Sequence, residues 1–165
     1  HKNLLNALSI IRLKNRDFCC IFIGSNMNKK NKILSNDIKK LQLEKHVKLL
    51  GPKNNIPQIM NELDVNILCS KSEGFPSVIV EAMACGTPCI VTNVGDSALI
   101  VGKTGWIVPS KNSIKLASAI EKALSEIGKN NWRRRCNQAR LRVKNNFEIN
   151  KMIKSYNLMW SKIYI

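Results

Sequence analysis

The chain has 165 residues, enough for one domain with its own hydrophobic core, and we expect a single domain over residues 1–165. Hydrophobic residues make up 44% of the sequence, and no apolar run approaches the ~18 residues that a membrane-spanning helix needs. We therefore expect no membrane span. The first residues open directly into a helical pattern without an apolar segment and cleavage site, so no signal peptide is expected. This beginning is typical of a segment cut from a longer chain.

The formal net charge of +16 is large enough to indicate a nucleic-acid or anionic-membrane surface. Most lysines are scattered over the expected solvent faces of helices. The one dense basic cluster covers residues 133–135, beside Trp132, and is followed by Arg140 and Arg142. We interpret it as a solvated helix face, with an acidic-lipid or anionic-partner surface as the alternative. No aromatic interleaving and no nucleic-acid motif accompanies the charge, so we expect no nucleic-acid partner.

Six cysteines lie mostly within apolar runs, where a free thiol behaves as a small hydrophobic group. They are Cys19, Cys20, Cys69, Cys85, Cys89 and Cys136. We interpret them as buried thiols in a reducing cytosol. A metal site at Cys85 and Cys89 is the alternative, but three residues separate these cysteines and no histidine lies nearby in the sequence, so we expect no metal.

The hydrophobic pattern predicts helices that alternate with strands along the first part of the chain. In chain order, we expect a helix over 2–14, a strand over 18–24, a helix over 33–41, a strand over 47–51, a short helix over 55–63, a strand over 65–69, a helix over 77–85 and a strand over 88–92. This alternation favours an α/β fold, a Rossmann-like parallel sheet with helices on both faces.

The remaining chain is expected to hold a short strand over 106–108, a helix whose apolar face includes Leu116 and Ile120, and two terminal helices over 130–165. The last helix repeats large apolar residues at intervals of three and four. These residues are Met152, Ile153, Tyr156, Met159, Trp160 and Ile163. We interpret this stripe as ordinary core packing. Docking on a domain outside the chain is the alternative.

The segment that carries the chemistry joins the strand at 65–69 to the helix at 77–85, where open α/β sheets bind ligands. Gly74 permits a close approach of the backbone to a ligand, and Pro76 suits the start of a helix. The first turn from Ser77 offers free N–H groups and the positive end of the helix dipole. The segment is therefore an anion site suited to a phosphate or diphosphate.

Two acidic residues add to this segment. Glu73 lies in the loop and Glu81 lies about one turn into the helix, a spacing at which both can face one crevice. A carboxylate near a helix start can be a mere dipole partner, worth roughly a few tenths of a kcal/mol. Beside a diphosphate-binding helix start, Glu81 is also well placed to accept hydrogen bonds from the vicinal hydroxyls of a ribose.

The stretch EGFPSVIVE at residues 73–81, followed by AMACGTP, resembles the E-x7-E signature of retaining glycosyltransferase family 4, the glycosyl transferases group 1. Other segments are similar to motifs of the same family: KNLL from Lys2, VKLLG from Val47, LDV from Leu63, VG from Val94 and GWIVP from Gly105. The resemblance covers residues 2–125. It implies the C-terminal, nucleotide-sugar-binding half of a GT-B enzyme, in which two Rossmann-like domains face each other.

The resemblance implies a role for each matching position. Glu73 would contact the donor sugar, the residues after it would donate backbone hydrogen bonds to the sugar and phosphates, and Glu81 would hold the ribose. Lys2 would pair with the diphosphate and stabilise it as the leaving group. The expected catalytic residues are thus Glu73 and Lys2, and the expected nucleotide-sugar-binding residues are Glu81, Gly74, Phe75, Pro76, Ser77, Val78, Lys53 and Ile56.

The sequence departs from the family pattern in three places. The family's arginine, which precedes the lysine, falls before His1, and so does the whole N-terminal acceptor domain. We therefore expect these residues alone to bind a nucleotide sugar, UDP- or GDP-linked, but to transfer little or no sugar. Where the family often carries a glutamate, this chain has Ala98 or Leu99, so we assign no role there.

The implied reaction is transfer of a hexose, with retained anomeric configuration, to a saccharide or lipid-linked acceptor. We expect no cofactor and no metal, because the sequence contains no D-x-D pair that would chelate a divalent ion on the diphosphate. Lys2 and the helix start at Ser77 would replace that ion. Glu73 as a covalent nucleophile is an alternative that we rank below a positioning role.

Three other functions stay open at this point. A nucleotide-sugar epimerase of the same fold is one alternative, a basic module that binds nucleic acid or an anionic surface is the second, and a non-catalytic scaffold is the third. The presence of Glu73, Glu81 and Lys2 favours the transferase. From the family and the basic surface, we expect a bacterial enzyme of polysaccharide biosynthesis, cytoplasmic and peripheral at the inner membrane.

Overall fold

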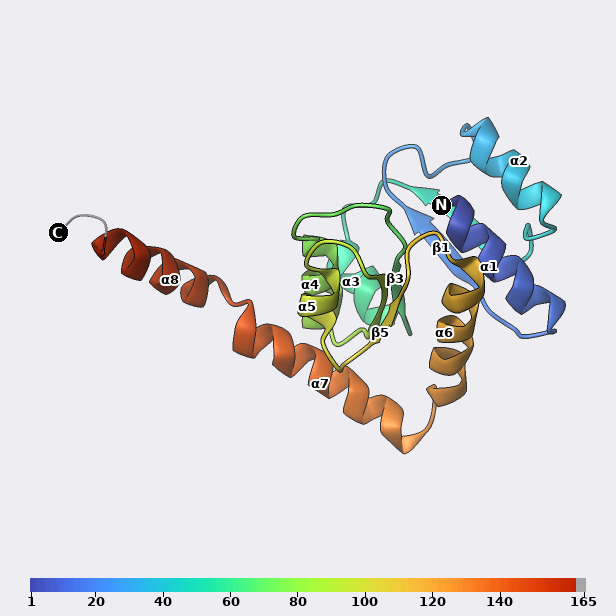
Figure 1. Ribbon diagram of the computed structural model, residues 1–165. Coiled ribbons are helices and arrows are strands. Elements are labelled where there is room, and N and C mark those ends of the chain that lie inside the picture. The colour runs from blue at the N-terminus through green and yellow to red at the C-terminus, as the bar shows by residue number, and fades with distance from the viewer. Residues whose placement is uncertain (163–165) are drawn as a thin grey trace.

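The computed structural model describes residues 1–162 and has the alternating order that the sequence predicts (Figure 1). The elements of this described part are α1 Lys2–Leu13, β1 Cys20–Ile23, α2 Lys32–Lys40, β2 Val47–Gly51, α3 Ile56–Glu62, β3 Asn66–Leu68, α4 Ser77–Ala84, β4 Cys89–Thr92, α5 Ser97–Val101, β5 Trp106–Val108, α6 Ser113–Glu126, α7 Asn130–Asn146 and α8 Ile149–Ser161. The short helix α5 is the one element that the sequence pattern did not predict.

Every strand pair in the described chain is parallel, which confirms the expected α/β fold. β1 pairs with β2, and β3, β4 and β5 form a second sheet in that order. The strands thus form two hydrogen-bonded groups in place of one continuous sheet, and β1 of one group and β3 of the other line the same cleft. Since parallel strands end at the same edge, the loops after β3, β4 and β5 lie near one another.

Helices cover both faces of the three-stranded sheet, with α1 and α6 on one side and α4 and α5 on the other (Figure 1). Successive residues of β4 point to opposite faces, as strand geometry requires. Ile90 belongs to the core formed with α1, α2 and α6. Cys89 and Val91 belong to a second core formed with α4, α5 and α7. The sheet is thus buried on both faces, as expected for parallel strands.

The basic cluster of α7 is only partly a solvated helix face. Arg133 and Arg134 are exposed. Arg135 instead forms a bidentate ion pair with Glu126, with Nε to Oε2 at 2.8 Å, and its guanidinium lies 4.3 Å from the ring centre of Trp106. The interpretation of the whole cluster as solvated was therefore wrong for Arg135, because its charge is paired and stacked at the junction of α6, α7 and β5.

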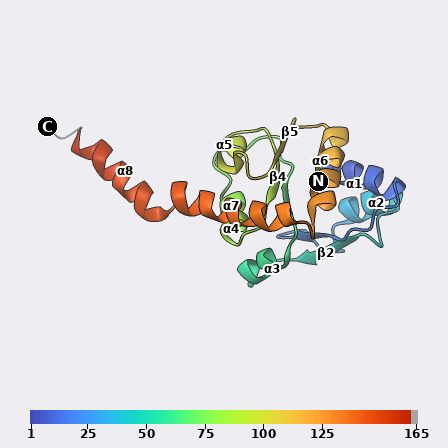
Figure 2. The same cartoon turned by 90° about the horizontal axis from the view of Figure 1, so that it is seen from below.

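The interpretation of the last helix as part of the core was also wrong. None of the α8 residues, all of which the structure describes, is buried. The helix extends away from the rest of the domain in both views (Figures 1 and 2). Large apolar side chains remain about half exposed, including Ile153 at 46% and Trp160 at 53%. Ile163, the last member of the predicted stripe, lies outside the described residues.

All six cysteines are free thiols, but they are not uniformly buried. Cys89 is buried, Cys19 is exposed, and the other four are half-buried. The expectation of buried thiols was therefore wrong for Cys19, which precedes β1. Burial raises the pKa of the Cys89 thiol to about 12, and burial likewise raises the pKa of Cys20 to about 12. Both side chains stay protonated at neutral pH and act as small apolar groups.

The core between α1 and α6 gives a direct test of the packing. Leu116 of α6 is fully buried, so Leu116→Ala should lower the free energy of unfolding by about 2–5 kcal/mol. Ile114 lies on the same helix with its side chain 71% exposed, so Ile114→Ala should cost less than about 0.5 kcal/mol. Urea unfolding measures both. Equal losses in the two variants would contradict this packing.

Candidate functional site

The loop that follows β3 is held by side-chain hydrogen bonds at its start. The fully buried Thr92 donates its hydroxyl to the carbonyl oxygen of Ser70 at 2.7 Å, which ties this loop to the end of β4. The Ser70 hydroxyl in turn donates to Oε1 of Glu73 at 2.6 Å. Hydrogen bonds to a charged carboxylate are among the stronger ones in proteins. Glu73 is therefore half-buried and held by a partner that is itself fixed by the sheet.

The same loop is held from its other side by the turn after β4. The Asp96 N–H donates to the carbonyl oxygen of Gly74 at 3.0 Å. Gly95 packs so tightly on this loop that a Cβ atom there would lie 2.2 Å from the carbonyl oxygen of Glu73 and 2.5 Å from that of Gly74. Its φ of +49° also favours glycine. The loops after β3 and β4 thus fit together backbone against backbone.

Helix α4 begins directly after this loop. Pro76 is buried and occupies the N-cap position, and within residues 1–162 no side chain caps the helix. The N–H groups of the first turn have no acceptor inside a helix, so those of Ser77 and Val78 are oriented toward whatever lies before α4. Ser77 is exposed, and so is Glu81 one turn later. The start of α4 is therefore accessible, with a carboxylate one turn later.

A cleft of about 1090 Å³ runs beside this helix start. Its lining brings Glu81, Val78 and Ile56 together, three of the expected nucleotide-sugar-binding residues, with Ser70 and His1 as neighbours. Glu73 is not part of the lining but contacts it through Ser70. The cleft therefore joins the start of α4, the start of α3 and the beginning of α1, and it extends along β1 and β3 as far as Arg16 and Asp17.

The other expected residues lie around this cleft and not in its wall. The lining does not include Lys2, Lys53, Pro76, Ser77, Gly74 or Phe75. Lys2 is exposed in the first turn of α1, beside His1, whose ring lies 5.6 Å from that of Phe22. Lys53 is exposed in the loop after β2. Both amines are thus free to meet a ligand.

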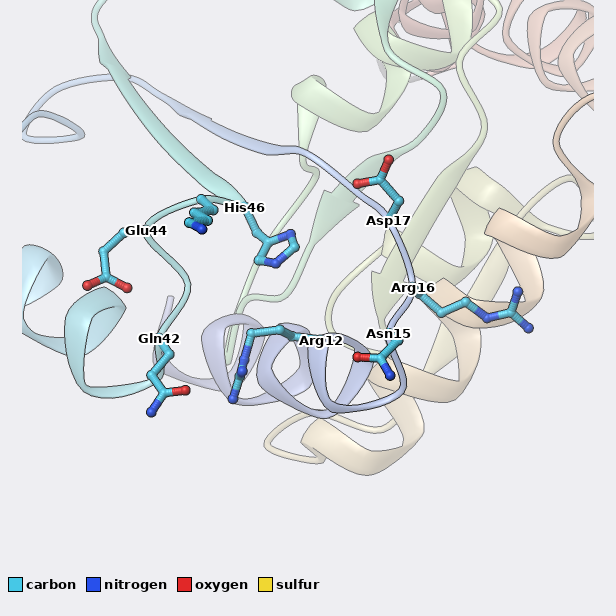
Figure 3. A pocket seen from close by; sticks show the side chains of 8 residues that line it. Arg12, Asn15, Arg16, Asp17, Gln42, Glu44 and His46 are labelled. Carbon is cyan, nitrogen blue, oxygen red and sulfur yellow. The ribbon is translucent and has the colours of Figure 1, made fainter.

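A second pocket, of about 700 Å³, lies at the opposite ends of β1 and β2 (Figure 3). It is lined by Arg12, Asn15, Arg16, Asp17, Gln42, Glu44, Lys45 and His46. Figure 3 shows that Arg16 and Glu44 point to opposite sides and do not converge on one position. This pocket lies before the strands and not after them, the edge where parallel sheets rarely bind ligands. The cleft beside α4 is therefore the better candidate.

No group of three or more potential metal ligands among His, Cys, Asp and Glu occurs within residues 1–162. No helix in this described part is long and apolar enough to cross a membrane. The metal-independent reaction expected from the sequence stays a prediction.

Sequence reasoning missed three residues that hold the site. Thr92, Gly95 and Asp96 fix the loop that carries Glu73, and none of them was an expected site residue, although VG at Val94 is one of the segments similar to a family motif. The available signal was a glycine three residues after the end of a buried strand, because such a glycine often marks a close approach of two backbone segments. The pattern alone did not tell which segment Gly95 approaches, because that contact joins residues about 20 positions apart.

Comparison with known proteins places this geometry in a family. Residues 1–141 match the family "Glycosyl transferases group 1". The chain is 32% identical over 127 residues to an Escherichia coli protein, UDP-Gal:alpha-D-GlcNAc-diphosphoundecaprenol alpha-1,3-galactosyltransferase, covering 73% of this chain and 32% of that protein. It is 39% identical over 72 residues to N-acetyl-alpha-D-glucosaminyl L-malate synthase of Bacillus anthracis, covering 42% of this chain and 19% of the synthase.

The chain also resembles parts of solved glycosyltransferase structures. A glycosyltransferase from Rickettsia africae superimposes with a TM-score of 0.88 at 28% identity, covering 98% of this chain and 43% of that one. HepE from Anabaena, in complex with UDP, gives a TM-score of 0.84 at 25% identity, covering 97% of this chain and 44% of HepE. The chain thus spans less than half the length of these proteins.

The fold and the site together define an α/β domain of the GT-B glycosyltransferase type. The chain belongs to the glycosyl transferases group 1 family, which covers residues 1–141 and therefore all elements from α1 to β5, the helix α6 and most of α7. The family expected from the E-x7-E segment is confirmed. The E. coli relative is named as a galactosyltransferase.

The contact at Gly95 yields a prediction about the loop. Gly95→Ala should push the Glu73 and Gly74 backbone away and break the Asp96 N–H bond, so amide hydrogen exchange should become faster across residues 73–77 and at Asp96. Gly128→Ala is the matched control, because Gly128 also has a positive φ, +78°, but nothing within 4 Å of its Cβ position.

The control should lose about 1–2 kcal/mol of stability from backbone strain alone and keep slow exchange in the loop. If Gly95→Ala left the exchange rates of the loop at wild-type values, the close packing of the two backbones would not be a constraint on this site.

Proposed function

We propose that the chain is the donor-binding part of a retaining glycosyltransferase that binds a UDP-linked hexose. The observation that carries the proposal is the uncapped start of α4, with the exposed Glu81 one turn later, beside a cleft of about 1090 Å³. A diphosphate suits free N–H groups at a helix start, and a carboxylate suits vicinal ribose hydroxyls. The choice of uracil rests on relatives: HepE is in complex with UDP, and the E. coli protein is named for UDP-Gal.

Each side chain has a role in this proposal. Glu81 accepts hydrogen bonds from the two ribose hydroxyls, and Ile56 and Lys53 contact the base beside the cleft. Backbone N–H groups of Ser77 and Val78 receive the diphosphate. Glu73 contacts hydroxyls of the sugar, with one oxygen already occupied by the Ser70 hydroxyl. Gly74, Phe75 and Pro76 shape the loop between these two ends of the donor.

The proposed chemistry is metal-independent. The bond between the anomeric carbon and the β-phosphate oxygen breaks and its electron pair stays on UDP, while the acceptor hydroxyl oxygen bonds to that carbon on the same face and its proton passes to the departing phosphate oxygen. The start of α4 and the Lys2 ammonium stabilise this added charge. In this proposal Glu73 positions the sugar and does not act as a covalent nucleophile. Retention is read directly from the anomeric configuration of the product.

We further propose that the donor domain acts with an acceptor-binding domain in a longer enzyme, and that these residues alone transfer little or no sugar. The chain spans 43% and 44% of the Rickettsia africae and Anabaena structures compared above. Helix α8 presents Ile153, Tyr156 and Trp160 on one face without an apolar partner in the described chain. A face of this kind is expected to be covered in the working protein.

The proposed place of action is the cytoplasmic face of a bacterial membrane, with a saccharide or lipid-linked acceptor and polysaccharide biosynthesis as the setting. The net charge of +16 and the exposed Arg133 and Arg134 favour contact with anionic lipid headgroups. The E. coli relative is named for an acceptor on diphosphoundecaprenol, a lipid carrier.

A thermal-shift titration tests the donor site. At a UDP concentration of 100 times Kd, binding adds about 2.7 kcal/mol of stability. For a chain of this size, the melting temperature should rise by roughly 5–10 °C. Glu81→Gln should remove most of the shift, because the amide replaces a charged acceptor for the ribose hydroxyls. Glu44→Gln, in the pocket at the other end of β2, is the matched control and should keep the full shift.

An equal UDP shift in wild type and Glu81→Gln would place the nucleotide elsewhere. ADP and GDP, titrated in parallel, report the base. A larger shift with GDP than with UDP would retain the donor site but overturn the choice of uracil.

The bare face of α8 gives a separate prediction for the longer enzyme. Ile153→Glu places a charge on the apolar face and should lower the stability of the longer enzyme by about 1–3 kcal/mol, with a parallel loss of transfer. Lys154→Glu, on the side of the same helix away from the apolar stripe, should change neither. In residues 1–165 alone, both variants should unfold like wild type, since none of the α8 residues is buried in the part of the chain that the structure describes.

Calorimetric unfolding of the two variants in both lengths of chain measures this. An Ile153→Glu enzyme with wild-type stability in the longer form would mean that α8 does not dock on the acceptor domain.

A further inference from the structure

The end of α7 directly contacts the loop between Glu73 and Pro76, which we call the donor loop. The ring of Phe147, the residue that ends α7, lies 6.0 Å from the ring of Phe75, with an angle of 58° between the planes. This is a favourable tilted arrangement for two aromatic rings. Phe75 is 54% exposed, so this ring has few other apolar neighbours. The loop between Glu73 and Pro76 therefore contacts a residue about 70 positions further along the chain.

A second contact, from the preceding turn of α7, reaches the loop indirectly. Arg142 donates from Nε to the carbonyl oxygen of Ile100 at 2.7 Å and from Nη2 to that of Leu99 at 2.5 Å, at the end of α5. These bonds satisfy carbonyls that a helix end leaves without partners. Gly102 leaves room for the guanidinium, since a Cβ there would lie 2.6 Å from Cζ. The other end of α5 is Asp96, whose N–H holds Gly74.

Helix α7 is itself firmly seated. Its buried residues Ala139 and Val143 belong to the core that contains Ile79 and Met83 of α4. The N–H of Phe147 still donates to the carbonyl oxygen of Val143 at 2.8 Å, so the ring is attached to the packed part of the helix. Helix α7 thus contacts α4, the end of α5 and the loop that joins β3 to α4.

We propose that Phe147 is a positioning residue for the donor sugar. Its ring holds Phe75 and thereby keeps Glu73 and Gly74 in the conformation that meets the sugar. The inference rests on the proposed function, because it assigns the loop at Glu73 to the sugar and the region around Glu81 to the nucleotide. The proposal therefore distinguishes binding of the sugar from binding of the nucleotide. Loss of the Phe147 ring weakens the binding of the sugar part of the donor and leaves the binding of UDP unchanged.

Calorimetric titrations of the longer enzyme with UDP and with UDP-galactose, UDP-glucose and UDP-N-acetylglucosamine test this. The UDP-sugar that binds wild type most tightly is then used for all variants. Phe147→Ala should weaken that sugar nucleotide about threefold to tenfold, the range expected for an aromatic pair, and leave the Kd of UDP unchanged. In the steady state, KM for the donor should rise more than kcat falls.

Three variants complete the design. Phe147→Leu keeps an apolar side chain of similar reach and should restore most of the affinity. Phe75→Ala combined with Phe147→Ala should be no weaker than Phe75→Ala alone, because the two rings act as one unit. Leu141→Ala, an exposed apolar residue 55% accessible on the same helix, is the matched control and should bind both ligands like wild type.

The outcomes are distinct. A parallel loss of UDP and UDP-sugar affinity in Phe147→Ala, together with a lower melting temperature, would assign Phe147 a role in stability only. Additive effects of the two phenylalanine variants would overturn the coupling. If wild type binds UDP and its sugars but Phe147→Ala binds them equally well, the positioning role fails and the donor site stands. If wild type binds none of them, both proposals fail.

Discussion

The backbone contact between Gly95 and the loop at Glu73 and Gly74 determines how the site is built. It brings the segments after β3 and β4 closer than any side chain would allow, with Cβ distances of 2.2 and 2.5 Å to two carbonyl oxygens. The Asp96 N–H then bonds to Gly74. Since α4 begins just after this loop, the same contact fixes the direction of its first turn. The position of the start of α4 follows from packing of backbone against backbone.

The two hydrophobic cores hold different parts of the candidate site in place. The core around α1 and α6 holds the beginning of the chain, with Lys2 and His1 near the cleft. The core around α4, α5 and α7 holds the loop and the helix start. Phe147 lies where α7 ends, and Ile149 begins α8 two residues later. The chain therefore leaves the domain at a point that touches the donor loop.

Much of this arrangement could be predicted from sequence because it depends on local patterns. Short apolar runs and helical periodicity identified every strand, and the E-x7-E segment identified the start of α4 and Glu81. The misses depend on distant partners. The stacking of Arg135 on Trp106, the exposure of α8 and the contact at Gly95 are set by which elements lie side by side. An amphipathic stripe looks the same whether it faces the core or a separate domain.

The most direct test of the central claim is a crystal structure of the longer enzyme bound to UDP. The account predicts that both ribose hydroxyls lie within hydrogen-bond distance of the Glu81 carboxylate, and that the diphosphate lies against the N–H groups of Ser77 and Val78. UDP bound away from α4, for example among Arg12 and His46 at the opposite ends of β1 and β2, would contradict it.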